Sequence, residues 1–494
     1  MARDPNTTAN KTFHSLCYPL FLFSVLSSFS FIYYTHCSPS PCSPPQTINP
    51  PLRNVSAVIN LLSFPSSWNH LFFSPNPPAR HLKIALFVKR WPLRNLAGGL
   101  ERHALTLHLA LARRGHQVHV FTTNSSFPNS SLPSYPNASI AFHPTSPSPG
   151  GYLNQPLAWQ QFQIQNSTGR PFDLVHTESV GLFHGRARNL TRLAVSWHGI
   201  AYETIHSDIV QDLLRGPNEP RHSAFPERLA KVVEEVKFFP AYSHHVATSD
   251  HVGDVLKRVY MIPEERVHII VNGVDEEIYK SEPSIGSSFR RKMGVPKRAK
   301  LVIGMAGRLV RDKGHPVMFE ALKQAFMEDS RFRETVFVLV AGDGPWGSRY
   351  KALGSNFIIL GPLDQTQLSE FYNSLDIFVN PTLRAQGLDH TFIEAMLSGV
   401  PVMGTRFASI TGSLIVGPEI GYTFQPTVES LKNSIFKVFR DGRIVLRRKG
   451  EAARERAAYL FTATKMAAAY ERLFLCLSNH HYCNYPLPGE GVVR

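Results

Sequence analysis

One pattern of strands, glycine loops and helices occurs in both halves of this sequence and restricts its fold more than any other feature. In the first half, the pattern predicts an apolar strand at 82–88, a loop at Gly98-Gly99, a helix at 100–115 and a strand at 117–123. Apolar residues recur on one face of this helix, and Gly115 has the position of its C-cap. A strand, a helix and a further strand in this order form a βαβ unit with parallel strands.

Further strands and helices extend both units into complete domains. The first half adds strands at 172–177, 192–198, 244–249 and 266–271. The second half has strands at 301–307, 336–342, 357–361, 376–381 and 401–405, with helices at 315–326 and 392–399. We therefore predict the α/β class, with two facing doubly wound, Rossmann-like domains at 81–285 and 286–455, and a C-terminal helix that crosses back, with a tail, at 456–494. Ligands bind such sheets at the carboxyl ends of their strands, and two facing domains favour a ligand cleft.

The net charge of +15 raises the question of a nucleic-acid partner. No run of five or more Lys or Arg residues occurs, so a basic surface spread over a large chain is the simpler interpretation. We expect no nucleic-acid partner, whereas a basic cleft would suit a polyanionic small molecule.

The N-terminus resembles a membrane anchor. Residues 16–34 are mostly apolar and uncharged, which is near the length that one bilayer-spanning helix needs. We expect a cytoplasmic tail at 1–15, a signal anchor at 16–35 and a stem rich in Pro and Ser at 36–80. A cleaved signal peptide is the alternative.

Cysteines and sequons indicate the compartment. No cysteine lies between positions 43 and 475, so no zinc spacing of cysteines occurs and the central body is not a disulfide scaffold. Cys476 and Cys483 are close enough in sequence to pair, but spacing leaves this open. Asn-x-Ser/Thr sequons occur at Asn54, Asn124, Asn129, Asn137, Asn166 and Asn189. We expect a single-pass type II glycoprotein of the Golgi or another secretory-pathway membrane, with its catalytic domain in the lumen.

Two motifs in the second half carry groups suited to a nucleotide. Arg308 and Lys313 lie in the Gly307–Gly314 loop that follows a predicted strand, where both can reach a diphosphate; solvated loop cations are the alternative. Gln386 to Glu394 spans a second loop and a helix start. Backbone amides of His390, Thr391 and Phe392 would favour phosphate there, and Glu394 could accept hydrogen bonds from a ribose diol. An exposed helix carboxylate is the alternative for Glu394.

Three further features are less specific. His198 ends a predicted strand and either faces the cleft or has a structural role. Gly98-Gly99 allows a backbone to approach a ligand, or forms a plain turn. Gly342 begins a formal GxGxxG match, but in the second strand of its domain, so a turn beside a nucleotide is favoured over NAD binding. Walker, HExxH, GxSxG and Asp-x-Asp motifs are absent from the sequence.

In their order and spacing, these motifs resemble the retaining GT-B glycosyltransferases of family 4, the group 1 type, from about residue 83 to about residue 469. The resemblance lies in Gly98–His103, His198-Gly199, Asn272–Asp275, Gly307-Arg308, Lys313-Gly314, Gly342–Pro345, Glu394–Met396 and Gly399–Pro401. The chain looks like plant members that carry an anchor and a stem.

The resemblance implies a metal-independent hexosyl- or pentosyltransferase without a cofactor, using a UDP- or GDP-sugar and a carbohydrate, lipid or glycoprotein acceptor. It implies that Arg308 and Lys313 bind the donor diphosphate and stabilise the leaving group, and that Glu394 binds the ribose. Gly98-Gly99, Gly307, Gly342, His390 and Thr391 would line the donor, and His198 would face the transferred sugar.

One position departs from the family pattern. The family has two acidic residues in E-x7-E, whereas the first position here is Gln386, which cannot carry negative charge or act as a base. An active transferase with altered sugar recognition is the leading hypothesis. An inactive homologue that serves as a subunit of a Golgi glycosyltransferase complex is the alternative.

Overall fold

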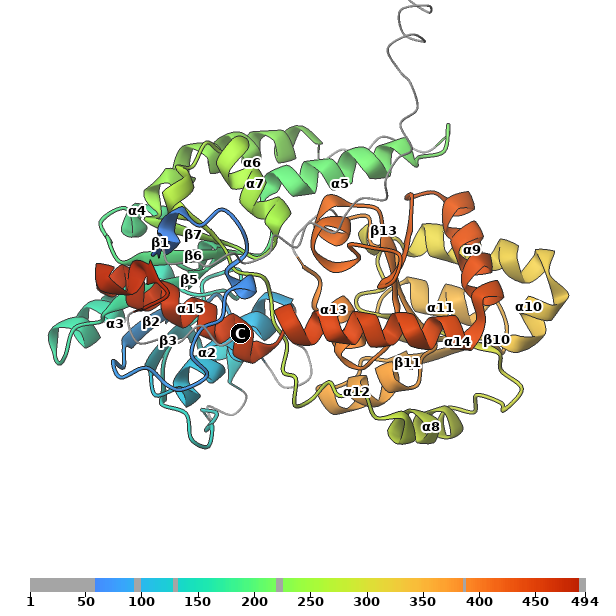
Figure 1. Cartoon of the computed structure of the whole chain (residues 1–494). Helices are drawn as coiled ribbons and strands as arrows, with labels where there is room; N and C mark the ends of the chain where they lie inside the picture. Colours follow the sequence, from blue (N-terminus) through green and yellow to red (C-terminus); the bar gives the residue numbers. More distant parts are fainter. Residues whose placement is uncertain (1–57, 93–98, 128–131, 219–224, 385–387, 488–494) are drawn as a thin grey trace, which may run out of the picture. The chain divides into compact units, whose positions relative to one another are not determined.

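The structure is a computed structural model that describes residues 58–92, 99–127, 132–218, 225–384 and 388–487. The expected cytoplasmic tail and signal anchor lie outside these residues. Within the part of the chain that the structure describes, no helix is both long and apolar enough to span a bilayer. The described residues form two parallel sheets, each with helices packed around it (Figure 1).

The first sheet has seven parallel strands in the order β4-β3-β2-β5-β6-β7-β8. Their bounds are β2 Lys83–Phe87, β3 Gln117–Thr123, β4 Ile140–Thr145, β5 Leu174–Glu178, β6 Leu193–Trp197, β7 His244–Ala247 and β8 Val267–Ile269. Six of these strands match the predicted ones. Edge strand β4 was not predicted, because it is half-buried and its sequence, IAFHPT, contains a proline and no clear alternation.

Helices connect these strands. The helices of the first half are α2 Gly99–Arg113, α3 Gln155–Ser167, α4 His184–Ala187, α5 Ala201–Leu213, α6 Phe225–Phe238 and α7 Asp250–Arg258. Helix α2 follows β2, as predicted, and buries Ala104, Leu107 and Leu111 on one face. Gly115 follows its C-terminus with a φ of 96°, the left-handed conformation that favours glycine.

The second sheet has six parallel strands in the order β11-β10-β9-β12-β13-β14. Its strands are β9 Leu301–Ala306, β10 Val336–Ala341, β11 Phe357–Gly361, β12 Ile377–Asn380, β13 Val402–Thr405 and β14 Gly421–Phe424. Its helices are α8 Pro283–Lys292, α9 His315–Glu328, α10 Ser330–Thr335, α11 Trp346–Lys351, α12 Gln365–Asn373, α13 His390–Leu397 and α14 Val428–Leu460. The expected domain boundaries at 285 and 455 fall inside α8 and α14.

Both sheets have a topological switch point, which confirms the predicted class of two Rossmann-like domains. In each sheet, successive strands are first added on one side of the first strand, and later strands are added on its other side. The strand order therefore reverses between β2 and β5 in the first sheet and between β9 and β12 in the second. Ligands of doubly wound sheets bind at the carboxyl ends of the strands at this point. The loops that follow these four strands are therefore where a site is expected.

The segment 58–80 differs from the stem expected through residue 80. Strand β1, Ile59–Asn60, pairs with β15, Asn484–Tyr485. The Trp68 side chain is fully buried, and Asn69 donates hydrogen bonds to the carbonyl oxygens of Val271 and Leu460. The apolar residues between 61 and 73 thus bury surface against the fold, which the low apolar content of the surrounding stretch concealed.

The last helix returns to the first sheet. Helix α14 runs toward the first half, and α15, Ala463–Ser478, lies against the first half (Figure 1). Tyr470 and Phe474 of α15 pack with Leu107 and Leu174 in one buried cluster. Cys476, in the last turn of α15, forms a disulfide with Cys483.

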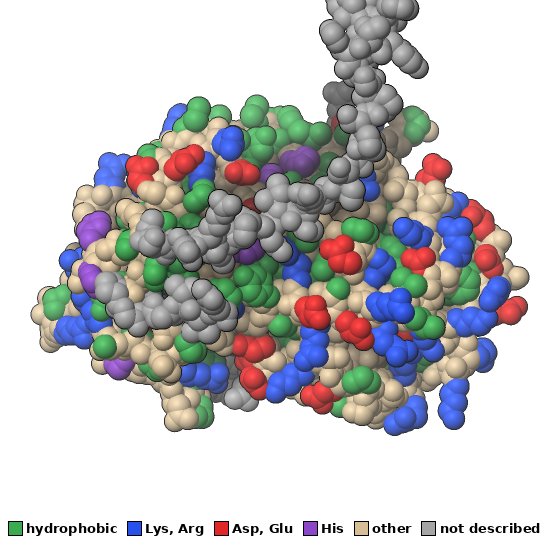
Figure 2. Space-filling model, viewed as in Figure 1, with side chains coloured by type: hydrophobic (Ala, Val, Ile, Leu, Met, Phe, Trp, Pro, Cys, Tyr) green, Lys and Arg blue, Asp and Glu red, His purple; other side chains and the backbone are tan. Residues whose placement is uncertain are grey.

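Surface charge is mixed. On the face seen in Figure 2, Lys and Arg side chains are scattered among Asp and Glu side chains over the second half. This distribution fits a basic surface spread over a large chain.

Candidate active site

Two glycines shape the edge of the second sheet. Gly307 follows β9 with a φ of 125°, and Gly342 follows β10 with a φ of 126°. A Cβ atom on Gly342 would lie 1.9 Å from the carbonyl oxygen of Gly307, so no larger residue fits at position 342. The two loops therefore run in close contact. Arg308 lies in the first of these loops, directly after Gly307, and its side chain is exposed.

Lys313 forms an ion pair at the same edge. Its Nζ atom lies 2.7 Å from Oδ2 of Asp389, which follows the β12 loop. Asp389 also accepts a hydrogen bond from Asn380. Burial alone would raise the pKa of Asp389, but Lys313 and hydrogen bonds from Thr391 outweigh burial and hold this pKa well below its usual range. The carboxylate of Asp389 is therefore ionised and partly neutralises Lys313.

The start of α13 is less open than the sequence predicted. The Thr391 amide donates to Oδ1 of Asp389 at 3.2 Å, and the Phe392 amide donates to the carbonyl oxygen of Asp389 at 3.2 Å. Two of the three amides expected to be free for phosphate are thus already hydrogen-bonded, because Asp389 is the N-cap of the helix. A phosphate at this position has to compete with the Asp389 side chain.

Glu394 is buried instead of exposed to a ligand. Its relative exposure is 1%, and its Oε1 atom lies 2.7 Å from an Nη atom of Arg102 in α2. The Tyr372 hydroxyl donates a hydrogen bond to Oε2 at 2.8 Å. Burial raises the pKa of Glu394, although Arg102 opposes the rise. The carboxylate expected to bind ribose is thus already paired with a residue of the first half.

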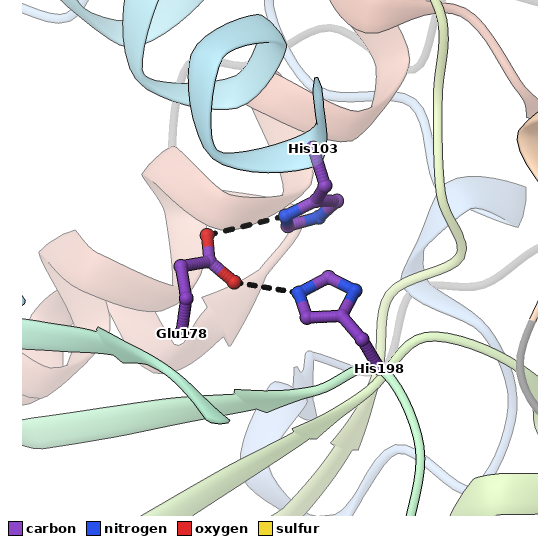
Figure 3. Close-up of side chains that lie close together, drawn as sticks. All are labelled: His103, Glu178 and His198. Carbon is purple, nitrogen blue, oxygen red and sulfur yellow. Dashed lines mark hydrogen bonds and ion pairs between the residues drawn. The ribbon is translucent and has the colours of Figure 1, made fainter. Parts of the chain in front are cut away.

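The edge of the first sheet carries a carboxylate between two imidazoles (Figure 3). Glu178 ends β5, His198 follows β6, and His103 lies in the first turns of α2. Glu178 accepts a hydrogen bond from His103 Nδ1 at 3.2 Å and from His198 Nε2 at 2.6 Å. Burial would raise the pKa of Glu178, but the two histidines lower it well below its ordinary value. Burial also lowers the pKa of His103.

A second histidine chain lies next to this triad. His108 Nδ1 donates to the carbonyl oxygen of Ala104, and His108 Nε2 lies 2.9 Å from His176 Nδ1. His176 Nε2 contacts the Ser196 hydroxyl, which contacts the Tyr470 hydroxyl. Burial lowers the pKa of His108 to about 4, so this chain is made of neutral rings.

Both clusters have the residue types of a metal site. Among the described residues, His103, Glu178 and His198 form one group of ligand atoms within 4.8 Å of each other, and His108, His176 and Glu178 form another. The contact of 2.6 Å between Glu178 and His198 is shorter than the ~3.3 Å between neighbouring ligand atoms of a tetrahedral zinc ion with bonds near 2.0 Å. This geometry is that of a hydrogen bond.

The two halves are in direct contact at these edges. Besides the ion pair of Arg102 with Glu394, Asn272 donates a hydrogen bond to the carbonyl oxygen of Leu388 at 2.9 Å. A Cβ atom on Gly99 would lie 3.6 Å from His390 Nδ1. The edge of the first sheet that bears Gly99 therefore adjoins the start of α13.

The predicted residues divide clearly by position. The edge of the second sheet holds Gly307, Arg308, Lys313, Gly342, His390, Thr391 and Glu394, and the edge of the first holds Gly99 and His198. Gly98 and Gln386 lie outside the described residues. Arg102, Glu178 and Asp389 were not predicted to have roles. Glu178 directly follows a predicted strand, so its position at a strand end was the available signal.

A separate hollow of about 640 Å³ lies at the opposite edge of the first sheet. Arg188, Ser243 and Arg266 line it, near the amino ends of β6, β7 and β8. Arg266 is already bonded to backbone carbonyl oxygens there. This edge is not where a doubly wound sheet binds its ligand.

Comparison with known families agrees with this architecture. Residues 97–278 match the family model described as Glycosyltransferase Family 4. Residues 300–441 match the model described as Glycosyl transferases group 1. The chain contains the two domains of a GT-B glycosyltransferase. The first match covers the strands of the first sheet from β3 to β8, and the second match covers all strands of the second sheet.

Curated relatives of these glycosyltransferase domains are distant. D-inositol 3-phosphate glycosyltransferase 2 of Catenulispora acidiphila is 27% identical over 40% of the chain, and the match covers 49% of that protein. A D-inositol 3-phosphate glycosyltransferase of Xylanimonas cellulosilytica is 25% identical over 64% of the chain and 76% of that protein. The chain thus spans about half of the first relative and about three quarters of the second.

Solved structures show the same fold. Sucrose-phosphate synthase from Thermosynechococcus elongatus has a TM-score of 0.64 at 19% identity, covering 81% of this chain and 99% of that one. The Anabaena protein HepE, in complex with UDP-glucose, has a TM-score of 0.57 at 19% identity, covering 80% and 99%. At this identity the likeness concerns the GT-B fold of the two glycosyltransferase domains.

Proposed function

We propose that this protein is a glycosyltransferase that moves a sugar from a nucleotide diphosphate sugar to a glycan, lipid or glycoprotein acceptor, with retention of the anomeric configuration. The observation that carries the proposal is the placement of Arg308, Lys313 and Glu394 at one edge of the second sheet. His198 follows β6 at the carboxyl edge of the first sheet, one strand beyond its switch point. This is the distribution of charge that a diphosphate, a ribose and a sugar need.

The cations supply the electrostatic part of the reaction. As the bond between sugar and diphosphate breaks, negative charge grows on the leaving phosphate, and Arg308 and Lys313 stabilise it without a metal. For the donor to bind, the ion pair of Lys313 with Asp389 must break so that Lys313 can contact the diphosphate. The ion pair of Arg102 with Glu394 must also break before ribose hydroxyls reach that carboxylate. The donor is a UDP- or GDP-sugar, and the Anabaena neighbour, solved with UDP and with UDP-glucose, favours the UDP-sugar.

We propose a secretory-pathway location, with the catalytic domain in the lumen of the Golgi and a single-pass type II anchor at 16–35. The disulfide between Cys476 and Cys483 supports an oxidising compartment. The sequon residues Asn124, Asn137 and Asn189 are exposed, as a glycoprotein requires.

The ion pairs also favour a second candidate, an inactive subunit of a glycosyltransferase complex. Asp389 occupies Lys313 and the start of α13, and Arg102 occupies Glu394. A site whose charges satisfy each other is stable without a donor. Gln386 adds to this alternative, because it lacks the charge of the family pattern.

Thermal shift with a panel of nucleotides and UDP- and GDP-sugars separates the two candidates. We expect one sugar nucleotide to stabilise the purified lumenal domain and to be hydrolysed slowly without acceptor. Arg308→Ala and Lys313→Ala should each weaken its binding at least ten-fold. Lys300→Ala, an exposed lysine at the amino end of β9, should bind normally.

Stabilisation without turnover favours the inactive subunit. If Gln386→Glu then restores hydrolysis, the lost charge at 386 is the reason for inactivity. Normal donor binding by both cation variants contradicts the site. A chain that binds no nucleotide contradicts the transferase and agrees with the inactive subunit, whose paired charges need no donor.

A further inference from the structure

The hollow at the amino edge of the first sheet has a basic lining. It lies in the first half, where Figure 1 labels α4, β6 and β7, and its volume of about 640 Å³ is in the range of pockets that bind small molecules. Its seven lining residues come from the end of α4 and from the residues at the starts of β6, β7 and β8. They include two arginines and a histidine, and none of them is acidic.

Arg266, directly before β8, is fixed in the wall of this hollow by neutral groups. Its Nε atom donates a hydrogen bond to the carbonyl oxygen of Ser243 at 2.8 Å. One of its Nη atoms donates to the carbonyl oxygen of Pro240 at 2.9 Å and to that of Tyr242. Arg102, in contrast, pairs with a glutamate. Among the described residues, Arg266 has no ion pair, and its second Nη atom has no hydrogen-bond partner.

The other charged groups of the lining are also without a counter-ion. Burial, and then the charges of Arg266 and His480, lower the pKa of His244 to about 4, and both of these charges are positive. Arg188, at the end of α4, is exposed and has neither an ion pair nor a side-chain hydrogen bond within the described part of the chain. Burial lowers the pKa of Arg266, and the exposed Glu265 opposes this only in part. The hollow therefore offers positive charge that no carboxylate of its lining neutralises.

The chemistry of the lining fits a phosphate group carried on a small polyol. The planar guanidinium group of arginine donates paired N–H bonds to phosphate oxygens, and the Thr191 hydroxyl adds a further polar group. The hollow is much larger than one phosphate ion needs. Pro240 and Ala241 add apolar surface to its wall, against which the C–H groups of a sugar ring can pack.

We propose that this hollow binds a soluble sugar phosphate, whose phosphate contacts Arg188 and Arg266 and whose ring packs against Pro240 and Ala241. A doubly wound sheet binds its nucleotide at the carboxyl ends of its strands, so this is a second site, separate from the donor site. The inference goes beyond the proposed function and does not depend on it, because an inactive subunit can bind the same ligand.

Titration calorimetry of the full chain in detergent, with glucose 6-phosphate as the probe, tests this site. The double variant Arg308→Ala with Lys313→Ala removes the cations of the donor site, so binding that remains in it occurs elsewhere. In this background we expect glucose 6-phosphate to bind one to one and glucose not to bind. Inorganic phosphate should bind about ten-fold more weakly than glucose 6-phosphate. Equal affinities for both phosphates would mean an adventitious ion only and would overturn the proposal.

Arginine variants locate the binding. Arg188→Ala should weaken glucose 6-phosphate binding about ten-fold, and Arg188→Lys less, because lysine keeps the charge but not the planar fork. Arg192→Ala is the matched control: Arg192 is an exposed arginine close in sequence that does not line the hollow, and its loss should leave the affinity unchanged. An equal loss in Arg188→Ala and Arg192→Ala shows a general attraction to basic surface and overturns the site. If Arg188→Ala does not fold, Arg188→Lys provides the same comparison.

The sequon beside the hollow provides a further check. Asn189 and Thr191 belong to one sequon, so a glycan on Asn189 would stand next to the lining. Asn189→Gln should bind glucose 6-phosphate as the wild type does. Binding that occurs only without the glycan overturns the inference, because the secreted protein would then be blocked. A chain that binds a sugar nucleotide but no glucose 6-phosphate refutes this inference alone and leaves the proposed function intact.

Discussion

Replacing Arg102 by Met tests whether the contact between the two halves is a buried ion pair. The substitution keeps most of the side-chain volume and leaves Glu394, with a relative exposure of 1%, without its cation. Removing one partner of a buried pair typically costs 3–5 kcal/mol. Here the cost has an upper limit, because Glu394 can take up a proton instead of remaining charged.

The pH dependence follows from that limit. Protonating a carboxyl with an ordinary pKa near 4.5 costs about 3 kcal/mol at pH 7 and about 1 kcal/mol at pH 5.5. Loss of Arg102 raises the folded-state pKa of Glu394 further above its unfolded value, so the folded variant binds the extra proton and loses stability as pH rises. The destabilisation by Arg102→Met should therefore be larger at pH 7 than at pH 5.5, by up to about 2 kcal/mol, because the raised pKa of Glu394 in the wild type already accounts for part of this pH dependence.

Urea unfolding followed by tryptophan fluorescence at both pH values measures this difference. Adding Glu394→Gln to Arg102→Met should recover most of the loss at pH 7, because no buried charge remains. Arg258→Met, at an arginine whose side chain is 81% exposed, should change stability little at either pH. An equal loss at both pH values, or a double variant as unstable as the single one, refutes the reasoning.

Three further predictions concern stability and modification. Burial lowers the pKa of His108 to about 4 and that of His245 to about 3, so the unfolded chain gains protons below pH 6.5 that the folded chain excludes. Stability should then fall by about 1 kcal/mol per histidine from pH 7.5 to 5.5, and an unchanged melting temperature would contradict this. Trp68→Ala should cost about 3–5 kcal/mol in urea unfolding, whereas no effect would restore the stem interpretation of 58–80. Mass spectrometry of secreted protein should find glycans at Asn124, Asn137 and Asn189, with lower occupancy at Asn166, which is half-buried and accepts a hydrogen bond from Phe172; full occupancy there would argue against this packing.

The sheets were predictable because buried parallel strands are nearly continuous apolar runs. Strands β9 and β10, with the sequences LVIGMA and VFVLVA, have no other reasonable interpretation. Strand β14, with the sequence GYTF, is too short for periodicity to identify. One edge strand of each sheet, β4 and β14, thus escaped the pattern, whereas the opposite edge strands, β8 and β11, satisfied it.

The site was predictable in its loops but not in its pairings. Glycine positions and strand ends located Arg308, Lys313 and Glu394, because topology alone places such loops together. The partners of these groups come from distant sequence: Arg102 for Glu394, and Asp389 for Lys313. No local pattern distinguishes an exposed helix carboxylate from one that an arginine of the other domain covers, so this part required the fold.

The return of α15 to the first sheet has a consequence for biosynthesis. Tyr470 and Phe474 fill a cluster that also contains Leu107 and Leu174, so this layer is incomplete until the last helix has left the ribosome. Domains usually fold in turn as they emerge. Here the N-terminal domain cannot complete its core before the C-terminal residues are synthesised. A chain that stops before Ala463 would therefore leave this apolar surface exposed, where chaperones and the quality-control machinery can bind it.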